Sequence, residues 1–433
     1  MHSARYQPDR PSPLRWTILF LLFAGFTLNI VDRQALSLAA PVIREQFHLS
    51  STQYGFIVFA FLFGMVLGQI PAGLLFDRKG PRFGFSLIVT WWSVANLMHA
   101  FAGSLLQFGS LRFLLGLGEC GSYSGSVKTV GRWFPEEERS FAGAVFVSGS
   151  LAGSVLAPPL IVFLTLRYGW QAAFLVPSSL GFVWLAAWLI VYREPGMRLQ
   201  SGQPTTQPAD YAPKPMSAGW LKPLLRLKVV WGVILIRALT GPVSHFYWYW
   251  LPEYLKAERG MGLQAIGLFA WLPYLFGGAG GLFGGWFSGL LLRRGWPVDR
   301  ARKTAFLLSV AVCLTAALVP FAPNAPAAMP LICLASAGIN SFSVTFIGLL
   351  TDLFPQHLLA RVSGLTGIGD GVVSMFLMLT TGIVVQHFSY LPVFIAAALM
   401  PVLGLASLYG LVRRVRKVEI SLPSRESIRR PSI

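Results

Sequence analysis

Long apolar segments, separated by short polar, glycine or proline breaks, constrain this chain more than any other feature. A helix needs about 20 apolar residues to cross a bilayer, and twelve segments reach about that length: 15–37, 53–76, 83–102, 105–127, 140–166, 170–192, 229–255, 263–291, 302–321, 325–350, 362–387 and 389–412. Only 12% of the residues are charged, against about 25% in soluble domains. The sequence predicts an all-α membrane protein with twelve transmembrane helices and excludes a water-soluble enzyme.

Basic residues are concentrated in alternate connections between these segments. The chain has 35 lysines and arginines against 17 aspartates and glutamates, a net charge of +18. If both termini are cytoplasmic, the connections on the opposite side hold few cations, namely Arg44, Arg167, Lys256 and Arg259. This asymmetry follows the positive-inside rule. It predicts a multi-pass protein of the cell (inner) membrane, and it explains the net charge through the lipid bilayer, without a nucleic-acid partner.

The chain divides into two comparable halves. Residues 193–228 form one long polar, proline-rich stretch, which predicts a cytoplasmic linker between six-helix bundles at 15–192 and 229–412. Residues 1–14 and 413–433 are then cytoplasmic tails. A loop at 73–82, rich in glycine and arginine, has a weak counterpart at 285–295. Two pseudo-symmetric six-helix bundles with a site between them are typical of secondary transporters.

Ionisable residues inside the predicted spans indicate where the site lies. A charge at the bilayer centre costs about 2.5–3.5 kcal/mol even on the insertion scale, so each needs a partner or a wet cavity. A guanidinium binds a carboxylate through two parallel hydrogen bonds, so the arginines among them favour a carboxylate-bearing substrate. The intramembrane set is Asp32, Arg33, Arg112, Glu119, Arg237 and Asp370.

Arg112, Gly116 and Glu119 stand at i, i+4 and i+7, which puts them on one helical face. This spacing places a cation, a gap and a carboxylate side by side, so that the charged pair can line a cavity. The alternative is a purely structural ion pair that ties the fourth helix to its neighbours. Buried ion pairs are poor stabilisers, which favours the functional interpretation.

A polar and aromatic stretch that begins at Arg237 predicts a second wall of the cavity. Tyr247 and His245 are its candidate substrate-binding residues. Tyr249 and Trp250 lie near the outer end of the span, where they suit membrane-interface anchors as well as a cavity wall.

Two glycine clusters, at 277–285 and 364–371, allow either close helix packing or broken helices at membrane depth. Asp370 lies in the second cluster, where a carboxylate has no use in packing, so we expect it to serve the cavity or a cation. The three cysteines fit no metal or disulfide spacing. We therefore expect no metal site and no cofactor.

Several motifs together resemble a known family. Gly73-x-x-x-Asp77-Arg78-x-Gly80-x-Arg82 resembles the best-known loop motif of the major facilitator superfamily, and Arg112-x-x-x-Gly116-x-Gly118 resembles its fourth-helix motif. Within the superfamily, further motifs are similar to those of the anion:cation symporter family, most of all its hexuronate and sugar-acid transporters: Asn29-x-x-Asp32-Arg33, Gly116-x-Gly118-Glu119, Trp133-Phe-Pro135-x-x-x-Arg139, Ala157-Pro158-Pro159, Arg237-x-x-x-x-Pro242 and Gly364-Leu-Thr-Gly367. The resemblance spans roughly residues 15–412.

The resemblance implies the major facilitator fold and proton-driven symport of an organic acid. It implies that Arg33 and Arg237 face the substrate carboxylate and that Glu119 is the principal proton carrier. It also implies a switchable pair between Asp32 and Arg112. The chain departs from the family at Cys120, where alanine is common, and at Asp370, where small or amide residues are usual.

The candidate residues form three groups. We expect substrate binding at Arg33, Arg237, Asn29, Tyr247, His245 and Asn340; proton coupling at Glu119, Asp32, Arg112 and Asp370; and gating at Gly73, Asp77, Arg78, Gly80 and Arg82. In the gate, we expect Asp77 to cap the positive end of the eleventh helix, near Arg361, only while the cytoplasmic side is closed.

We expect a monomeric secondary transporter that takes up a sugar acid such as a hexuronate by alternating access, with H⁺ as the coupling ion. The same arginines also suit a non-sugar carboxylate, aromatic or dicarboxylic, or inorganic phosphate. A signalling sensor is disfavoured because no cytoplasmic domain is added. A membrane-embedded enzyme is disfavoured because no Ser/His/Asp set, metal cluster or HExxH motif is present.

Overall fold

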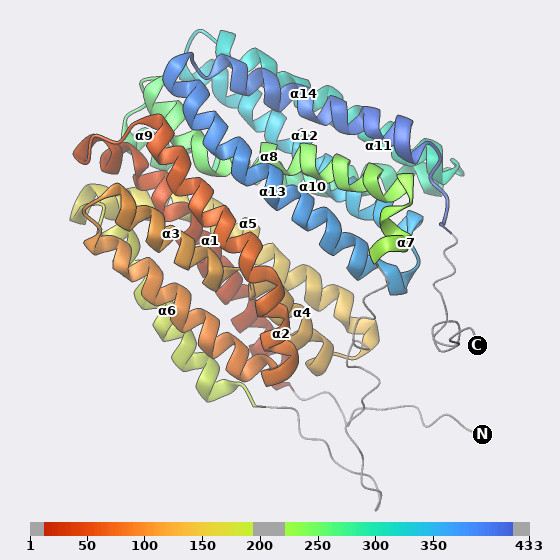
Figure 1. Ribbon diagram of the computed structural model, residues 1–433, viewed down its shortest axis with the longest axis horizontal. Coiled ribbons are helices and arrows are strands. Elements are labelled where there is room, and N and C mark those ends of the chain that lie inside the picture. Colours follow the sequence, from red (N-terminus) through yellow and green to blue (C-terminus); the bar gives the residue numbers. More distant parts are fainter. Residues whose placement is uncertain (1–12, 194–220, 419–433) are drawn as a thin grey trace, which may run out of the picture.

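The computed structural model describes residues 13–193 and 221–418, and within them the chain is helical with no strands. This confirms the predicted all-α class (Figure 1). The elements are α1 (Leu14–Gln46), α2 (Ser51–Met98), η1 (His99–Phe101), α3 (Leu105–Glu119), α4 (Ser122–Trp133), α5 (Glu136–Tyr168), α6 (Ala172–Val191), α7 (Leu221–Leu225), α8 (Lys228–Ala257), α9 (Leu263–Phe269), α10 (Leu272–Arg293), α11 (Val298–Cys313), η2 (Leu314–Phe321), α12 (Ala325–Leu353), α13 (Gln356–His387), α14 (Leu391–Ser407) and η3 (Leu408–Val412).

These elements account for the twelve predicted spans. In the described part of the chain, ten helical stretches are long and apolar enough to cross a membrane. One of them, Ser51–Phe101, has 51 residues and contains both the second and the third predicted span. The fourth predicted span, 105–127, is not one helix, because α3 ends at Glu119 and α4 begins at Ser122. Counting the stretch Ser51–Phe101 as two crossings, and adding the crossing formed by α3 and α4, brings the ten stretches to twelve crossings.

Gly80 is where α2 divides into its two crossings. Its φ of 76° lies in the left-handed region, and Pro81 follows it. Glycine adopts this conformation without steric cost, so the chain turns there between two apolar segments. The turn is held by Phe76, whose ring occupies the space that a Cβ would need at Gly84 and Gly125, 2.5 and 2.3 Å away. The break therefore follows from local sequence.

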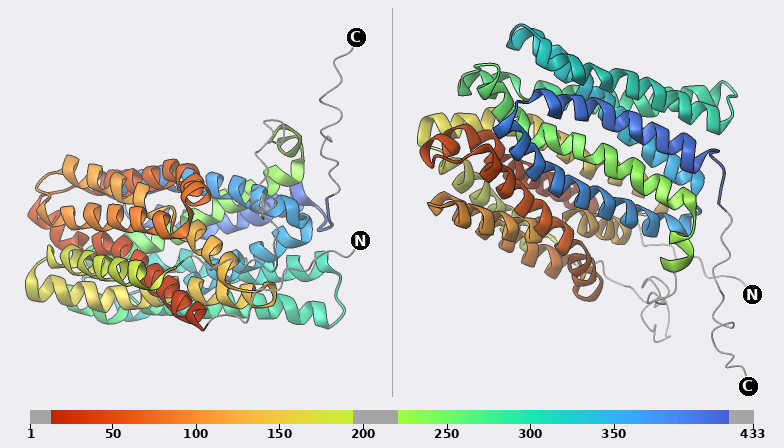
Figure 2. Two further views of the ribbon diagram at one scale, coloured as in Figure 1. Left: turned by 90° about the horizontal axis from the view of Figure 1, so that it is seen from below. Right: turned by 45° about the horizontal axis from the view of Figure 1, so that its top comes forward.

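The helices form two side-by-side bundles, drawn in red to yellow and in green to blue (Figures 1 and 2). We call α1–α6 the N-half and α8–α14 the C-half. The halves meet where α13 packs on α2, α8 on α1, and α9 and α10 on α5. Residues 194–220 of the predicted linker and most of both predicted tails lie outside the described residues. The end of that linker carries the short helix α7, and the domain boundaries stay predictions.

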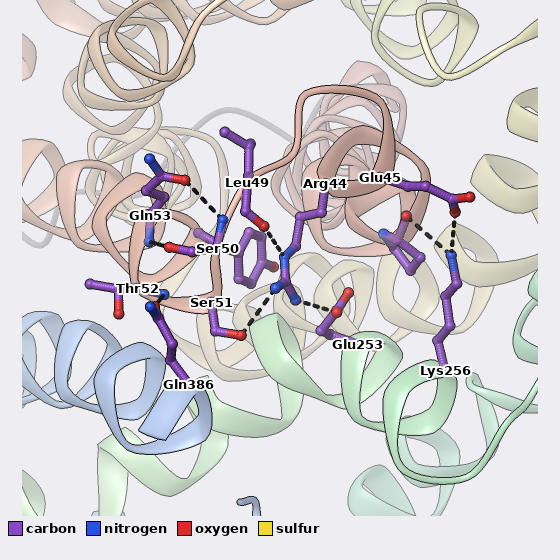
Figure 3. Close-up of polar contacts among 12 residues, drawn as sticks. Arg44, Glu45, Leu49, Ser50, Ser51, Thr52, Gln53, Glu253, Lys256 and Gln386 are labelled. Carbon is purple, nitrogen blue, oxygen red and sulfur yellow. Dashed lines mark hydrogen bonds and ion pairs between the residues drawn. The ribbon is translucent and has the colours of Figure 1, made fainter. Parts of the chain in front are cut away.

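Ion pairs between the halves lie near one end of the molecule, which we call the far end (Figure 1, beside α9). Arg44 of α1 pairs with Glu253 of α8, and beside it Lys256 Nζ is 3.0 Å from Glu45 Oε2 (Figure 3). The backbone of α2 also meets α13 there, since a Cβ at Gly382 would lie 2.5 Å from the Ser51 carbonyl oxygen. The far end is therefore closed.

At the opposite end, the terminus end, α1 and α8 begin. Asp77 there pairs with Lys128 of its own half, at 2.8 Å. Nothing lies within 4 Å of the Cβ position at Gly73 on α2 or at Gly364 and Gly367 on α13. At these three positions the described residues leave the two halves apart. Among the described residues, no contact of Asp77 with the eleventh helix is present, and that helix, α13, begins at Gln356, several residues earlier than expected. The cap is expected only while this end is closed, so it stays a prediction.

The other residues of the predicted gating motif lie at the same end. Arg82 donates to the Leu189 carbonyl oxygen, at 3.2 Å, which ties the turn after Gly80 to α6. Arg78 is exposed. The gating role of this motif stays a prediction.

Candidate functional site

The N-half places a buried ion pair midway along α1. Arg33 Nε lies 3.1 Å from Glu119 Oε2, with side chains 13% and 0% exposed. Glu119 is the last residue of α3, so the end of that helix delivers its carboxylate to α1. Arg33 also donates through Nη2 to Asn29 Oδ1, at 3.2 Å, one turn earlier on α1. These three predicted site residues are brought together.

Arg112 is fully buried beside this pair but does not form the predicted ion pairs. Its Nη1 donates a long hydrogen bond, 3.4 Å, to the Arg33 carbonyl oxygen, and its guanidinium lies over the rings of Phe61 and Phe174. Within residues 13–193 and 221–418, its Nε and Nη2 have no hydrogen-bond partner. Among the described residues, no ion pair joins Arg112 to Asp32 in this conformation, and the switchable pair between them stays a prediction.

Asp32 is held by another residue instead. Its Oδ1 accepts from Asn96 Nδ2 at 2.7 Å, and the same nitrogen is 3.1 Å from Ser178 Oγ. Asp32 Oδ2 and Glu119 Oε1 have no hydrogen-bond partner among the described residues. The N-half therefore holds two buried carboxylates, each with one oxygen free to accept.

Gly116 does not provide the predicted gap beside Arg112 and Glu119. A Cβ there would lie 2.2 Å from the Phe61 carbonyl oxygen of α2. The glycine lets α3 pack directly on the α2 backbone, which brings Phe61 under the guanidinium groups of Arg33 and Arg112, 5.5 and 5.9 Å from the ring centre. Its role is to position the cluster.

The C-half carries a second arginine–carboxylate pair. Arg237 Nη2 lies 2.8 Å from Asp370 Oδ2, with side chains 31% and 10% exposed. Ser374 Oγ donates to Asp370 Oδ1 at 3.0 Å and lies 3.2 Å from His245 Nδ1. Helices α8 and α13 thus join at this cluster, which includes three of the predicted residues, Arg237, Asp370 and His245.

Tyr249 connects the two clusters. Its ring is stacked on His245, with centroids 6.2 Å apart, and meets Phe61 edge-on at 6.1 Å. Phe61 in turn lies under the Arg33 guanidinium, 5.5 Å from the ring centre. The alternative of membrane-interface anchoring is wrong for Tyr249 and for Trp250, since both side chains are buried and the ring of Trp250 packs against Tyr54.

Two predicted residues lie outside these contacts. Asn340 of α12 donates to the Ser336 carbonyl oxygen at 2.9 Å and packs beside Gly277 of α10. Tyr247 is buried, and no described residue hydrogen-bonds its hydroxyl. Among the described residues, no hydrogen bond or ion pair joins either of them to the arginines. Their binding role stays a prediction.

Sequence reasoning missed several polar residues of the site. Asn96 and Ser178 hold Asp32, the ring of the buried His99 stacks on Phe174 beneath Arg112, and Ser374 holds Asp370. Asn96 and His99 carried a usable signal, because a polar residue inside an apolar span needs a partner just as a charge does. The serines carried none, since a hydroxyl can bond to its own helix.

The two bundles, with facing arginine–carboxylate pairs, define a membrane transporter rather than an enzyme, and the family is shown by comparison. A sequence model of the Major Facilitator Superfamily matches residues 22–368, and the chain belongs to this superfamily. It is 28% identical to the hexuronate transporter of Escherichia coli (strain K12) over 419 residues, which cover 94% of this chain and 96% of that protein. It is also 28% identical to the D-galactonate transporter of Escherichia coli O6:H1 over 428 residues, covering 94% and 98%.

The fold is that of solved transporters. A bacterial homologue of the human lysosomal transporter Spinster, in an inward-facing and occupied conformation, superposes with a TM-score of 0.73 at 18% identity, over 93% of this chain and 98% of that one. This similarity confirms the predicted major facilitator fold.

Proposed function

We propose that this chain takes up a sugar acid such as a hexuronate together with protons, by alternating access across the cell inner membrane. Both termini lie in the cytoplasm in this proposal, as the positive-inside rule favours. The printed names of the relatives support the sugar acid. The conformation described above is then closed toward the outside and open toward the cytoplasm, where cargo is released.

The observation that carries the proposal is the pair between Arg33 and Glu119. Arg33 has the fork geometry that a carboxylate needs, but in this conformation a buried carboxylate of the protein occupies it. A proton on Glu119 removes the charge that holds the guanidinium and leaves Arg33 available to a substrate carboxylate. The proton on Glu119 and the acid on Arg33 then bind together and leave together. This coupling between the two sites is what makes the transport a symport.

Glu119→Gln tests this coupling in proteoliposomes, with labelled D-galacturonate as the probe. The glutamine cannot take up and release a proton, so accumulation driven by a pH gradient should be lost, at least about tenfold in initial rate. Exchange of internal for external substrate needs no net proton movement, so it should persist. Glu138→Gln is the matched control, because Glu138 also pairs with an arginine, Arg15, but lies away from the site. Gradient-driven accumulation by Glu119→Gln at the wild-type rate would refute the proton-carrier role.

A further inference from the structure

Arg237 is already occupied by a carboxylate of the protein. Asp370 contacts it through Oδ2, and Ser374 donates to the other carboxylate oxygen. Gly241 makes this arrangement possible, since a Cβ there would lie 1.8 Å from Asp370 Oδ1. A helix position without a side chain, a hydroxyl donor and a guanidinium thus converge on one carboxylate. The pair belongs to the folded structure of the C-half.

Among the described residues, the polar contacts of Asp370 come from α8 and α13. Helix α8 contributes Arg237 and His245, whose Nδ1 is 3.9 Å from Asp370 Oδ1. Helix α13 contributes the hydroxyl of Ser374, and α2 presents the apolar Val66, which packs on the neighbouring Gly371. The positive charge of Arg237 is therefore balanced within the C-half.

The two halves consequently offer different chemistry to one cargo molecule. In the proposed function, Arg33 receives the substrate carboxylate once Glu119 is protonated. The opposite end of the cargo then meets Arg237 and Asp370 together, a donor and an acceptor side by side, which suits hydroxyl groups. A second carboxylate at that end would lie against Asp370, and like charges placed together in a desolvated site repel each other strongly.

We propose that Asp370 is a specificity-determining residue that restricts the site to acids with a single carboxylate and a hydroxylated far end. This inference rests on the proposed function and deepens it by naming the substrate class. It uses rejection as well as attraction, since the acidic residue acts against di-acids that Arg237 alone would bind.

The test compares D-galactonate with galactarate, which share one six-carbon skeleton and differ by a second carboxylate. Binding to the full-length protein, purified in detergent, is measured by calorimetry at neutral pH. We expect the wild type to bind the mono-acid at least about tenfold more tightly. In Asp370→Asn, which frees Arg237, this preference should fall at least about tenfold. Asp370→Glu should keep it.

Asp352→Asn is the matched control. It also removes a carboxylate paired with an arginine, Arg302, but inside the C-half and away from the site, so the preference should not change. If Asp370→Asn fails to fold, Asp370→Ser, which also removes the carboxylate and keeps Arg237, should lose the preference for the mono-acid in the same way.

The outcomes separate the two proposals. Equal binding of both acids by the wild type, or an unchanged preference in the folded Asp370 variants, overturns the specificity inference while leaving sugar-acid transport intact. Failure of the wild type to bind either compound or D-galacturonate overturns the proposed function, and the inference with it.

Discussion

Arg33 concentrates the chemistry of the N-half in one side chain. Its guanidinium contacts Glu119 and Asn29 and lies over Phe61, and its carbonyl oxygen accepts from Arg112. A planar fork is matched to a carboxylate in a way that the point charge of a lysine is not. Substrate affinity should therefore depend on having arginine at this position, beyond having a positive charge there.

Arg33→Lys should weaken binding of D-galactonate by about 1–3 kcal/mol, or roughly 5-fold to 150-fold in affinity, because the charge stays and the fork is lost. Calorimetry on the purified protein measures the change. Arg300→Lys serves as the control, since Arg300 lies over Trp296 away from both clusters. Affinity within twofold of the wild type for Arg33→Lys would show that Arg33 does not hold the carboxylate through two bonds.

At the scale of elements, the site depends on how closely α3 packs on α2. A Cβ at Gly64 would lie 2.2 Å from the Phe113 carbonyl oxygen, and one at Gly116 equally close to that of Phe61. Each glycine lies against the backbone of the other helix, so the two backbones pack in direct contact, as small residues allow between transmembrane helices. This contact sets the position of α3 against α2, and hence where Glu119 lies relative to α1.

Gly116→Ala should destabilise the protein by about 1–3 kcal/mol, because the added methyl group meets backbone that cannot rotate away. The readout is a lower thermal unfolding temperature in detergent. Gly289→Ala on α10 is the control, since nothing lies within 4 Å of its Cβ position and alanine favours a helix by about 0.5–1 kcal/mol. Equal melting temperatures for the two variants would contradict this account of the packing.

At the scale of the whole molecule, closure of the far end rests on charge pairs between α1 and α8 (Figure 3). Glu45 is largely exposed and Lys256 partly so, and such solvent-exposed pairs contribute little. Arg44 and Glu253 are mostly buried, and Arg44 also donates to Ser51 and to the Leu49 carbonyl oxygen. The buried pair should therefore dominate the closure.

Glu253→Gln should move the population toward a conformation open at the far end, at least about tenfold, because a hydrogen bond to a charged partner contributes about 1.5–3 kcal/mol. Spin labels at Leu74 of α2 and Ile368 of α13 report the change as a shorter distance across the terminus end, once the three native cysteines are replaced by serine. Lys256→Gln, which removes the more exposed pair with Glu45 and a hydrogen bond to the Pro41 carbonyl oxygen, should shift the distances far less. Identical distance distributions in wild type and Glu253→Gln would contradict the role of this pair.

Hydropathy sufficed to predict the helices, because crossing a bilayer imposes a length and an apolar composition on each segment. It could not predict that α3 ends at Glu119, since that break depends on packing against α2 and on the start of α4. The arginines and carboxylates were found by their cost inside a membrane. Which residues pair with them could not be predicted. Asn96 bonds to Asp32, and Asp370 pairs with Arg237, across helices that are distant in the sequence.

The charge balance of the two clusters has an electrical consequence. Arg33, Arg112 and Arg237 stand beside Asp32, Glu119 and Asp370, and in ionised form these groups sum to zero. A membrane potential acts on a moving charge with about 2.3 kcal/mol per elementary charge per 100 mV, so it exerts no net pull on the empty carrier as that carrier reorients. Voltage can enter the cycle only through the cargo: a monovalent acid with one proton carries no current, and each proton beyond the first makes uptake electrogenic.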